Sequence, residues 1–137
     1  TSIDLKDYIE ELSNNLVMNF GSEFQLNLKL ESLRINIDKA IPLGLIMNEI
    51  ITNSLKYGKN GNLLPSLSIS VENFDTKVLL KIGDNGKGLP EGFDWKLSDS
   101  FGLKLVHSLV SQLEGEIDYK GDNGSKWLLT LDKNKLL

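Results

Sequence analysis

Polar side chains suited to holding a cation and a phosphate group recur along one apolar segment, which runs from Ile41 to Gly58. At about 100° of rotation per residue, a helix would collect them on one side and leave aliphatic side chains on the other. The polar side would carry Glu49, Thr52, Asn53 and Lys56, and the apolar side Leu43, Met47, Ile51 and Leu55. A carboxylate and a carboxamide one turn apart can hold a hydrated hard cation, and a lysine one turn further on can meet phosphate oxygens.

The same helix also has a simpler interpretation, as an ordinary amphipathic helix with its polar side in water. Asn and Thr are indifferent helix formers, and a solvated face would more naturally carry Glu, Lys and Gln. The composition of the polar side therefore favours a binding role.

A second candidate segment, Asp84 to Pro90, follows an apolar strand pattern. Gly86 and Gly88 permit backbone torsions closed to other residues and let a ligand approach the main chain closely. Asp84, at the end of the strand, can accept a hydrogen bond from an exocyclic amine. The segment matches neither the P-loop nor the dinucleotide fingerprint, and by itself it is also consistent with a tight loop.

The third candidate segment, Ser100 to Leu105, places Gly102 at the start of a helix. The unpaired N–H groups of a helix N-terminus suit a phosphate, although any helix start would share this feature.

Periodicity predicts the elements that must position these side chains. Apolar residues at helical spacing predict helices, and strict alternation predicts strands, two of them forming an antiparallel hairpin. Pro42 is expected at the first position of the central helix, with Gly58 just past its end. The predicted helices are 3–20, 42–57 and 101–113, and the predicted strands are 24–30, 33–37, 67–71, 78–82, 116–120 and 126–132. This order favours an α+β fold, with helices on one face of a mixed, mostly antiparallel sheet.

Composition limits the classes of function. The 137 residues, 40% of them hydrophobic and 25% charged, suit a single domain over 1–137. A net charge of −4 argues against a basic face for nucleic acid or an anionic membrane. The chain has no cysteine and no apolar run near the ~20 residues of a membrane-spanning helix, so we expect this domain in the cytoplasm.

The order of the three segments resembles the ATP-binding domain of the GHKL superfamily, which includes DNA gyrase, the ninety-kilodalton heat-shock chaperones, histidine kinases and the MutL proteins. Glu49–Tyr57 is similar to its N box, 84–88 to its G1 box, and 100–105 to its G2 box. Gly124-Ser125 resembles the closing Gly-Thr element. Within the superfamily, the chain most resembles histidine kinases of the HWE and HisKA_2 type. The resemblance implies a Bergerat-type two-layer sandwich.

The resemblance also implies site residues and two cofactors, ATP and Mg²⁺. Asn53 would coordinate Mg²⁺, and Glu49 would act as a general base, polarise a metal-bound water or support the site. The implied nucleotide-binding residues are Asn53, Lys56 and Tyr57 on the central helix, Asp84, Gly86 and Gly88 in the G1 box, and Gly102, Leu103 and Ser125. Asp84 would accept the adenine amino proton, helped through water by Ser125. The residues between Pro90 and Ser100 would form a short lid over the nucleotide.

The partners are likewise implied. The γ-phosphate would pass to a histidine on a separate dimerisation domain, in cis or in trans, and then to a response regulator. Residues 1–20 would lead in from dimerising helices of a longer sensor kinase, soluble or membrane-anchored. His107, the one histidine, is not expected to be the acceptor, because it lies on a helix that begins at the nucleotide site and lacks a following acidic residue.

Three other functions stay open at this point. One is an anti-sigma-factor-type serine kinase, and another is an ATPase module of the gyrase, MutL or chaperone kind, which Glu49 would support. The third is a degenerate nucleotide-binding module used for interaction.

Overall fold

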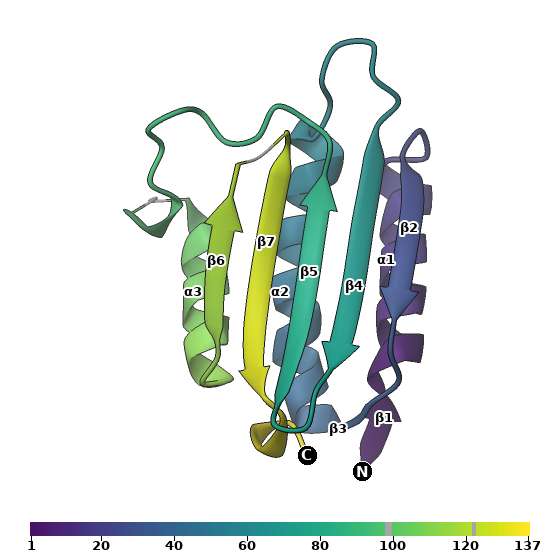
Figure 1. Cartoon of the computed structure of the whole chain (residues 1–137), viewed down its shortest axis with the longest axis vertical. Helices are drawn as coiled ribbons and strands as arrows, with labels where there is room; N and C mark the ends of the chain where they lie inside the picture. Colours follow the sequence, from purple (N-terminus) through teal and green to yellow (C-terminus); the bar gives the residue numbers. More distant parts are fainter. Residues whose placement is uncertain (98–99, 122) are drawn as a thin grey trace.

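The computed structural model describes residues 1–97, 100–121 and 123–137, and in this part of the chain a five-stranded sheet packs against three helices (Figure 1). The strands are β1 (Ser2–Asp4), β2 (Gln25–Leu30), β3 (Arg34–Asn36), β4 (Ser66–Asn73), β5 (Lys77–Asp84), β6 (Glu116–Lys120) and β7 (Ser125–Asp132). The helices are α1 (Leu5–Phe20), α2 (Ile37–Tyr57) and α3 (Phe101–Gln112), with short 3₁₀ turns η1 (Trp95–Leu97) and η2 (Lys133–Lys135).

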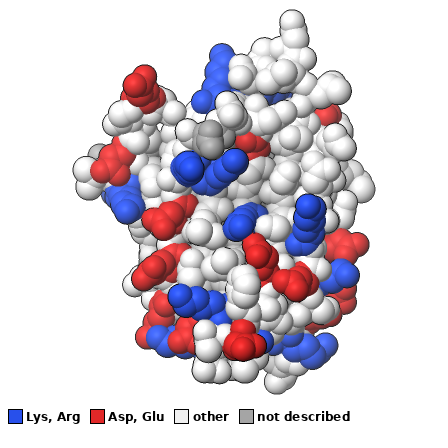
Figure 2. Space-filling model, viewed as in Figure 1, with Lys and Arg blue, Asp and Glu red and all other residues white. Residues whose placement is uncertain are grey.

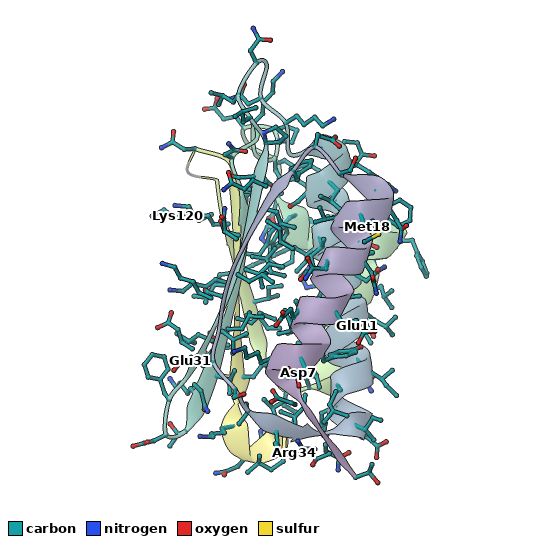
Figure 3. All side chains as sticks on the ribbon, turned by 90° about the vertical axis from the view of Figure 1, so that its right-hand side faces the viewer. Asp7, Glu11, Met18, Glu31, Arg34 and Lys120 are labelled. Atoms are coloured by element: carbon teal, nitrogen blue, oxygen red, sulfur yellow. The ribbon has the colours of Figure 1, made fainter. Side chains whose placement is uncertain are left out.

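The large sheet has the strand order β2-β4-β5-β7-β6, with β2 parallel to β4 and the other neighbours antiparallel. β1 and β3 form a separate antiparallel pair. Viewed from the side, the helices lie on one side of the sheet, while Lys120 and Glu31 are on the other (Figure 3). The predicted α+β class, with a mixed, mostly antiparallel sheet and helices on one face, is therefore confirmed, as is the predicted hairpin β4–β5.

The core lies between the sheet and α2. Leu43, Met47 and Ile51 of α2 are fully buried, together with Leu67 and Ile69 of β4. Burying side chains of this size contributes about 1.5–3 kcal/mol each relative to exposure. Because this apolar side of α2 is fixed against the sheet, its polar side is fixed in direction as well.

Two predicted boundaries were wrong. α2 begins at Ile37, predicted as strand, and not at Pro42, because Asn36 caps the helix by accepting a hydrogen bond from the Asp38 N–H at 2.8 Å. Pro42 lies inside the helix, where its missing N–H leaves one helical hydrogen bond unmade. At the N-terminus, β1 pairs with β3 over residues 2–4, so α1 begins at Leu5 with Asp4 as its cap.

Three residues of the predicted loops lie outside the described residues: 98 and 99 of the predicted lid, and 122 of the predicted turn between β6 and β7. Among the helices that the structure describes, none combines the length and the apolar character needed to cross a membrane.

Candidate functional site

Most of the predicted site residues line one cavity of about 290 Å³. It lies where α2 and β5 end and where α3 and β7 begin, at one end of the molecule (Figure 1). The predicted residues in its wall are Glu49, Asn53, Tyr57, Asp84, Gly102, Leu103 and Ser125, joined by Ser54, Gly58, Leu89, Ser100 and Trp127. Lys56, Gly86 and Gly88 are not part of this wall, and Lys56 is exposed on the last turn of α2.

The Asp84 carboxylate is the buried charge of the cavity, with 9% of the residue exposed. Its Oδ2 accepts a hydrogen bond from the Ser54 hydroxyl at 2.6 Å, and its Oδ1 accepts from the Gly86 N–H at 2.9 Å. The Ser125 N–H donates a longer one, at 3.4 Å, to Oδ1. A buried carboxylate needs such donors, and its oxygens offer about four acceptor positions in all. Asp84 is thus held in one orientation and can still accept from one further donor.

Glycines bring the backbone close to Asp84. A Cβ added to Gly58 would lie 2.9 Å from the Asp84 carboxyl carbon, and one added to Gly86 would clash with the backbone of Gly58. Gly124 has a φ of +126°, and a Cβ there would clash with the Asp84 carbonyl. Gly86 therefore packs the end of β5 onto the end of α2, and these contacts fix where Asp84 lies.

The Tyr119 hydroxyl connects the loop after Gly88 to the end of the sheet. It accepts a hydrogen bond from the Leu89 N–H at 2.8 Å, and it lies 3.1 Å from the Ser125 hydroxyl, where either group can donate. Sequence reasoning missed Tyr119, Ser54 and Gly58 as parts of the site. In the sequence, Tyr119 is one position of an alternating strand, Ser54 follows Asn53, and Gly58 ends a helix. None of these features indicates a ligand.

Glu49 and Asn53 lie one turn apart on α2, and the Asn53 amide donates to Glu49 Oε1 at 3.4 Å. The amide oxygen of Asn53 keeps its acceptor capacity, so the pair offers oxygen ligands to a hard cation. The Glu49 carboxylate also packs against Gly102, since a Cβ there would clash with Glu49 Oε1. It therefore lies beside the N-terminal turn of α3.

The N-terminus of α3 is capped by Ser100, whose hydroxyl accepts a hydrogen bond from the Leu103 N–H at 3.3 Å. This predicted anion-binding amide is thus already engaged in the described structure, and an anion here would share or replace the cap.

A larger hollow, of about 670 Å³, lies on the open face of the sheet. Its lining includes three small residues, Ser68, Ser70 and Gly83, and four lysines, Lys29, Lys81, Lys120 and Lys126. Figure 2 shows basic side chains around this part of the face. The carboxamide and the carboxylate of this hollow, Asn27 and Asp118, come from β2 and β6, at opposite ends of the strand order, and not from adjacent turns of one helix as Glu49 and Asn53 do, so the candidate site is the smaller cavity.

Comparison with known proteins gives a family and relatives. Residues 38–135 match the family described as histidine kinase-, DNA gyrase B-, and HSP90-like ATPase. The chain is 25% identical over 104 residues to Blue-light-activated histidine kinase 2 of Erythrobacter litoralis, covering 74% of this chain and 30% of that protein. It is 32% identical over 82 residues to Sensor histidine kinase PdtaS of Mycobacterium tuberculosis, covering 58% and 16%. The chain thus spans a minor part of the length of these relatives.

Solved structures show the same fold. The histidine kinase domain of the Erythrobacter litoralis EL346 blue-light activated histidine kinase aligns with a TM-score of 0.88 at 20% identity, over 98% of this chain and 65% of that one. The Acinetobacter baumannii histidine kinase AdeS aligns with a TM-score of 0.80 at 22% identity, over 98% and 67%. At these identities the likeness establishes the fold.

Proposed function

Because the chain belongs to the family of histidine kinase-, DNA gyrase B- and HSP90-like ATPases, we propose that it binds Mg·ATP and donates the γ-phosphate to a histidine on a separate dimerisation domain. The observation that carries this proposal is that the fixed carboxylate of Asp84 and the Glu49–Asn53 pair line the same cavity. Asp84 can select a base that bears an amino group, and the Glu49–Asn53 pair can hold a cation beside the phosphates.

In this proposal Asp84 accepts the hydrogen bond of the adenine amino group, with Ser125 next to it. Tyr57 packs near the base, and Gly86 and Gly88 shape the loop around it. The cavity, about 290 Å³, lies just below the ~300–1,000 Å³ typical of small-molecule sites, so it suits the nucleoside better than the whole nucleotide. The phosphates would extend toward Lys56 and the amides of Gly102 and Leu103.

The residues present also fit Mg²⁺, which usually binds through one or two protein oxygens together with substrate phosphates. Of the oxygen-bearing side chains in the cavity wall, the hydrogen-bonded pair Glu49 and Asn53 is the one that we assign to Mg²⁺. Within the described residues there is no group of three or more acidic, histidine or cysteine side chains that would form a complete metal cage. When bound, Mg²⁺ supplies charge neutralisation at the phosphate oxygens.

Glu49 can play more than one part in phosphate transfer. Its carboxylate can accept a proton from the attacking imidazole, support the metal, or polarise a metal-bound water. We propose it, with Asn53, as a catalytic residue.

The sequence relatives support a finer proposal about the parent protein. Both are named histidine kinases, one of them activated by blue light. We propose that residues 1–137 are one catalytic domain of a sensor kinase of the HWE or HisKA_2 type, that this domain works in the cytoplasm, and that a response regulator receives the phosphate.

Phosphotransfer from ATP labelled at the γ-phosphate tests the function directly. The parent protein is expected to acquire phosphate that is stable to base and lost in acid, as a phosphohistidine is. Phosphoserine on a partner protein would instead indicate the anti-sigma-factor-type kinase. Steady ATP hydrolysis by this chain, with no acceptor present, would indicate the ATPase module that Glu49 also suits.

Glu49→Gln tests the contact between the Glu49 carboxylate and α3. A negative charge at a helix N-terminus is favourable by about 0.3–1 kcal/mol, and it competes with a phosphate for the same end of the helix. Without Mg²⁺, we expect the variant to bind ADP about threefold more tightly than the wild type, as measured by calorimetry. Glu11→Gln, an exposed change on α1, should leave the affinity unchanged. Equal or weaker ADP binding by Glu49→Gln would contradict this placement of the carboxylate.

A further inference from the structure

Trp95 is a buried side chain in the loop between β5 and α3, with 6% of the residue exposed. Its ring stacks on His107 of α3, with the ring centres 4.6 Å apart and the planes at 3°. It also makes an edge-on contact with Trp127 of β7, with the ring centres 4.9 Å apart and the planes at 81°. Trp95 therefore ties the loop to a helix and to the sheet at once.

Trp127 connects this packing to the nucleotide cavity. It lines the cavity, and Tyr119 packs against it with ring centres 4.7 Å apart. The Tyr119 hydroxyl holds the Leu89 N–H and lies beside Ser125. The segment Leu89–Leu97, here called the lid segment, is thus attached at Leu89 and at Trp95 to one aromatic cluster, formed by Trp95, His107, Tyr119 and Trp127.

His107 supports the cluster by its ring and not by hydrogen bonding at Nε2. This nitrogen is buried and has no hydrogen-bond partner within the described part of the chain. The residue does not line the nucleotide cavity. A flat ring stacked on Trp95 is therefore the feature of His107 that the structure uses.

We infer that His107 is a positioning residue of the nucleotide site: by stacking on Trp95 it holds the lid segment in place and so sets the affinity for nucleotide. This inference rests on the proposed nucleotide binding. A protein whose binding-competent state is only partly populated binds more weakly by that fraction, so loosening the lid segment weakens affinity without touching the ligand. Loss of one aromatic pair is expected to change the affinity about threefold to tenfold.

Three single variants distinguish this positioning role of His107 from no role in nucleotide binding and from a role as the phosphate acceptor. His107→Phe keeps a flat ring against Trp95, His107→Ala removes it, and Ser108→Ala is a matched change at an exposed position on the same helix. We expect His107→Ala to weaken ADP binding about threefold to tenfold and to speed amide hydrogen exchange over residues 89–97. His107→Phe and Ser108→Ala should stay within about twofold of the wild type in both measurements.

Trp95→Ala provides a second route to the same result. It should weaken ADP binding as His107→Ala does, and the double variant should be no worse than either single one, because both remove the same contact. Far-UV circular dichroism and thermal unfolding establish that each variant is folded.

Four outcomes would overturn the inference. The first is an unchanged ADP affinity and unchanged hydrogen exchange in folded His107→Ala, and the second is an additive loss of ADP affinity in the double variant. The third is a loss of ADP affinity in His107→Phe equal to that in His107→Ala, and the fourth is a loss of phosphotransfer in the parent protein carrying His107→Phe while ADP binding stays normal. The last would make His107 the phosphate acceptor. If the wild type binds no nucleotide at all, the proposed function fails, while hydrogen exchange in the same variants still decides whether His107 holds the lid segment.

Discussion

Asp84→Asn is expected to weaken ADP binding about 100-fold while leaving the fold intact. The amide has the shape of the carboxylate, its oxygen can still accept from the Gly86 N–H, and its nitrogen can donate to the Ser54 hydroxyl, which also accepts. Toward an adenine amino group, however, the variant has lost the negative charge. The amide nitrogen that replaces Oδ2 also cannot accept a hydrogen bond. A lost hydrogen bond to a charged group, together with a donor left unpaired, amounts to about 3 kcal/mol.

Calorimetry with ADP measures this change, and Asp118→Asn is the matched control, because Asp118 lies exposed on β6. The preference for ADP over GDP should also fall in Asp84→Asn, since guanine presents an acceptor where adenine presents a donor. An ADP affinity within threefold of the wild type in the folded variant would show that Asp84 does not recognise the base.

Asn53→Ala is expected to remove the dependence of nucleotide binding on Mg²⁺ and to slow phosphotransfer by about 100-fold or more. A metal that neutralises phosphate charge contributes several kcal/mol to such reactions, and Asn53 is one of the two residues of the cavity wall that we propose as ligands of that metal. Alanine is the better helix former, so the variant should fold.

The measurement is the affinity for ADP with and without Mg²⁺, together with the initial rate of transfer in the parent protein. Asn48→Ala serves as the control, because Asn48 is on the same helix and does not line the cavity. Mg²⁺ should tighten ADP binding to the wild type and to Asn48→Ala but not to Asn53→Ala. If Mg²⁺ tightens binding to all three equally, the metal is held elsewhere.

Local patterns predicted the parts of the fold that depend on nearby residues. The two sides of α2 follow from a period of 3.6, so Asn53 and Glu49 could be placed together from the sequence. The turn-forming run after β5 placed Asp84 at the end of a strand. These residues now line the same cavity, although what each of them binds stays a prediction.

Contacts between distant segments could not be read from the sequence. The cap at Asn36 competes with Pro42 as a helix start, and the pairing of β1 with β3 decides where α1 begins. Gly58 and Gly86 each resemble an ordinary turn glycine, and only their mutual approach shows that they fix Asp84. The stacking of Trp95 on His107 likewise joins two separate segments, and no periodic pattern in the sequence relates these two positions.

The parallel pairing of β2 with β4 bears on the order in which the chain folds. Parallel neighbours need a long crossover, and here the crossover contains α2, whereas β4 and β5 are joined by a short turn. Closing a long loop costs entropy before the contacts that offset this cost can form, so the local β4–β5 pair forms more readily than the β2–β4 pair. One wall of the cavity belongs to the crossover itself. The candidate site is therefore expected to acquire its geometry late in folding, after the hairpin that carries Asp84.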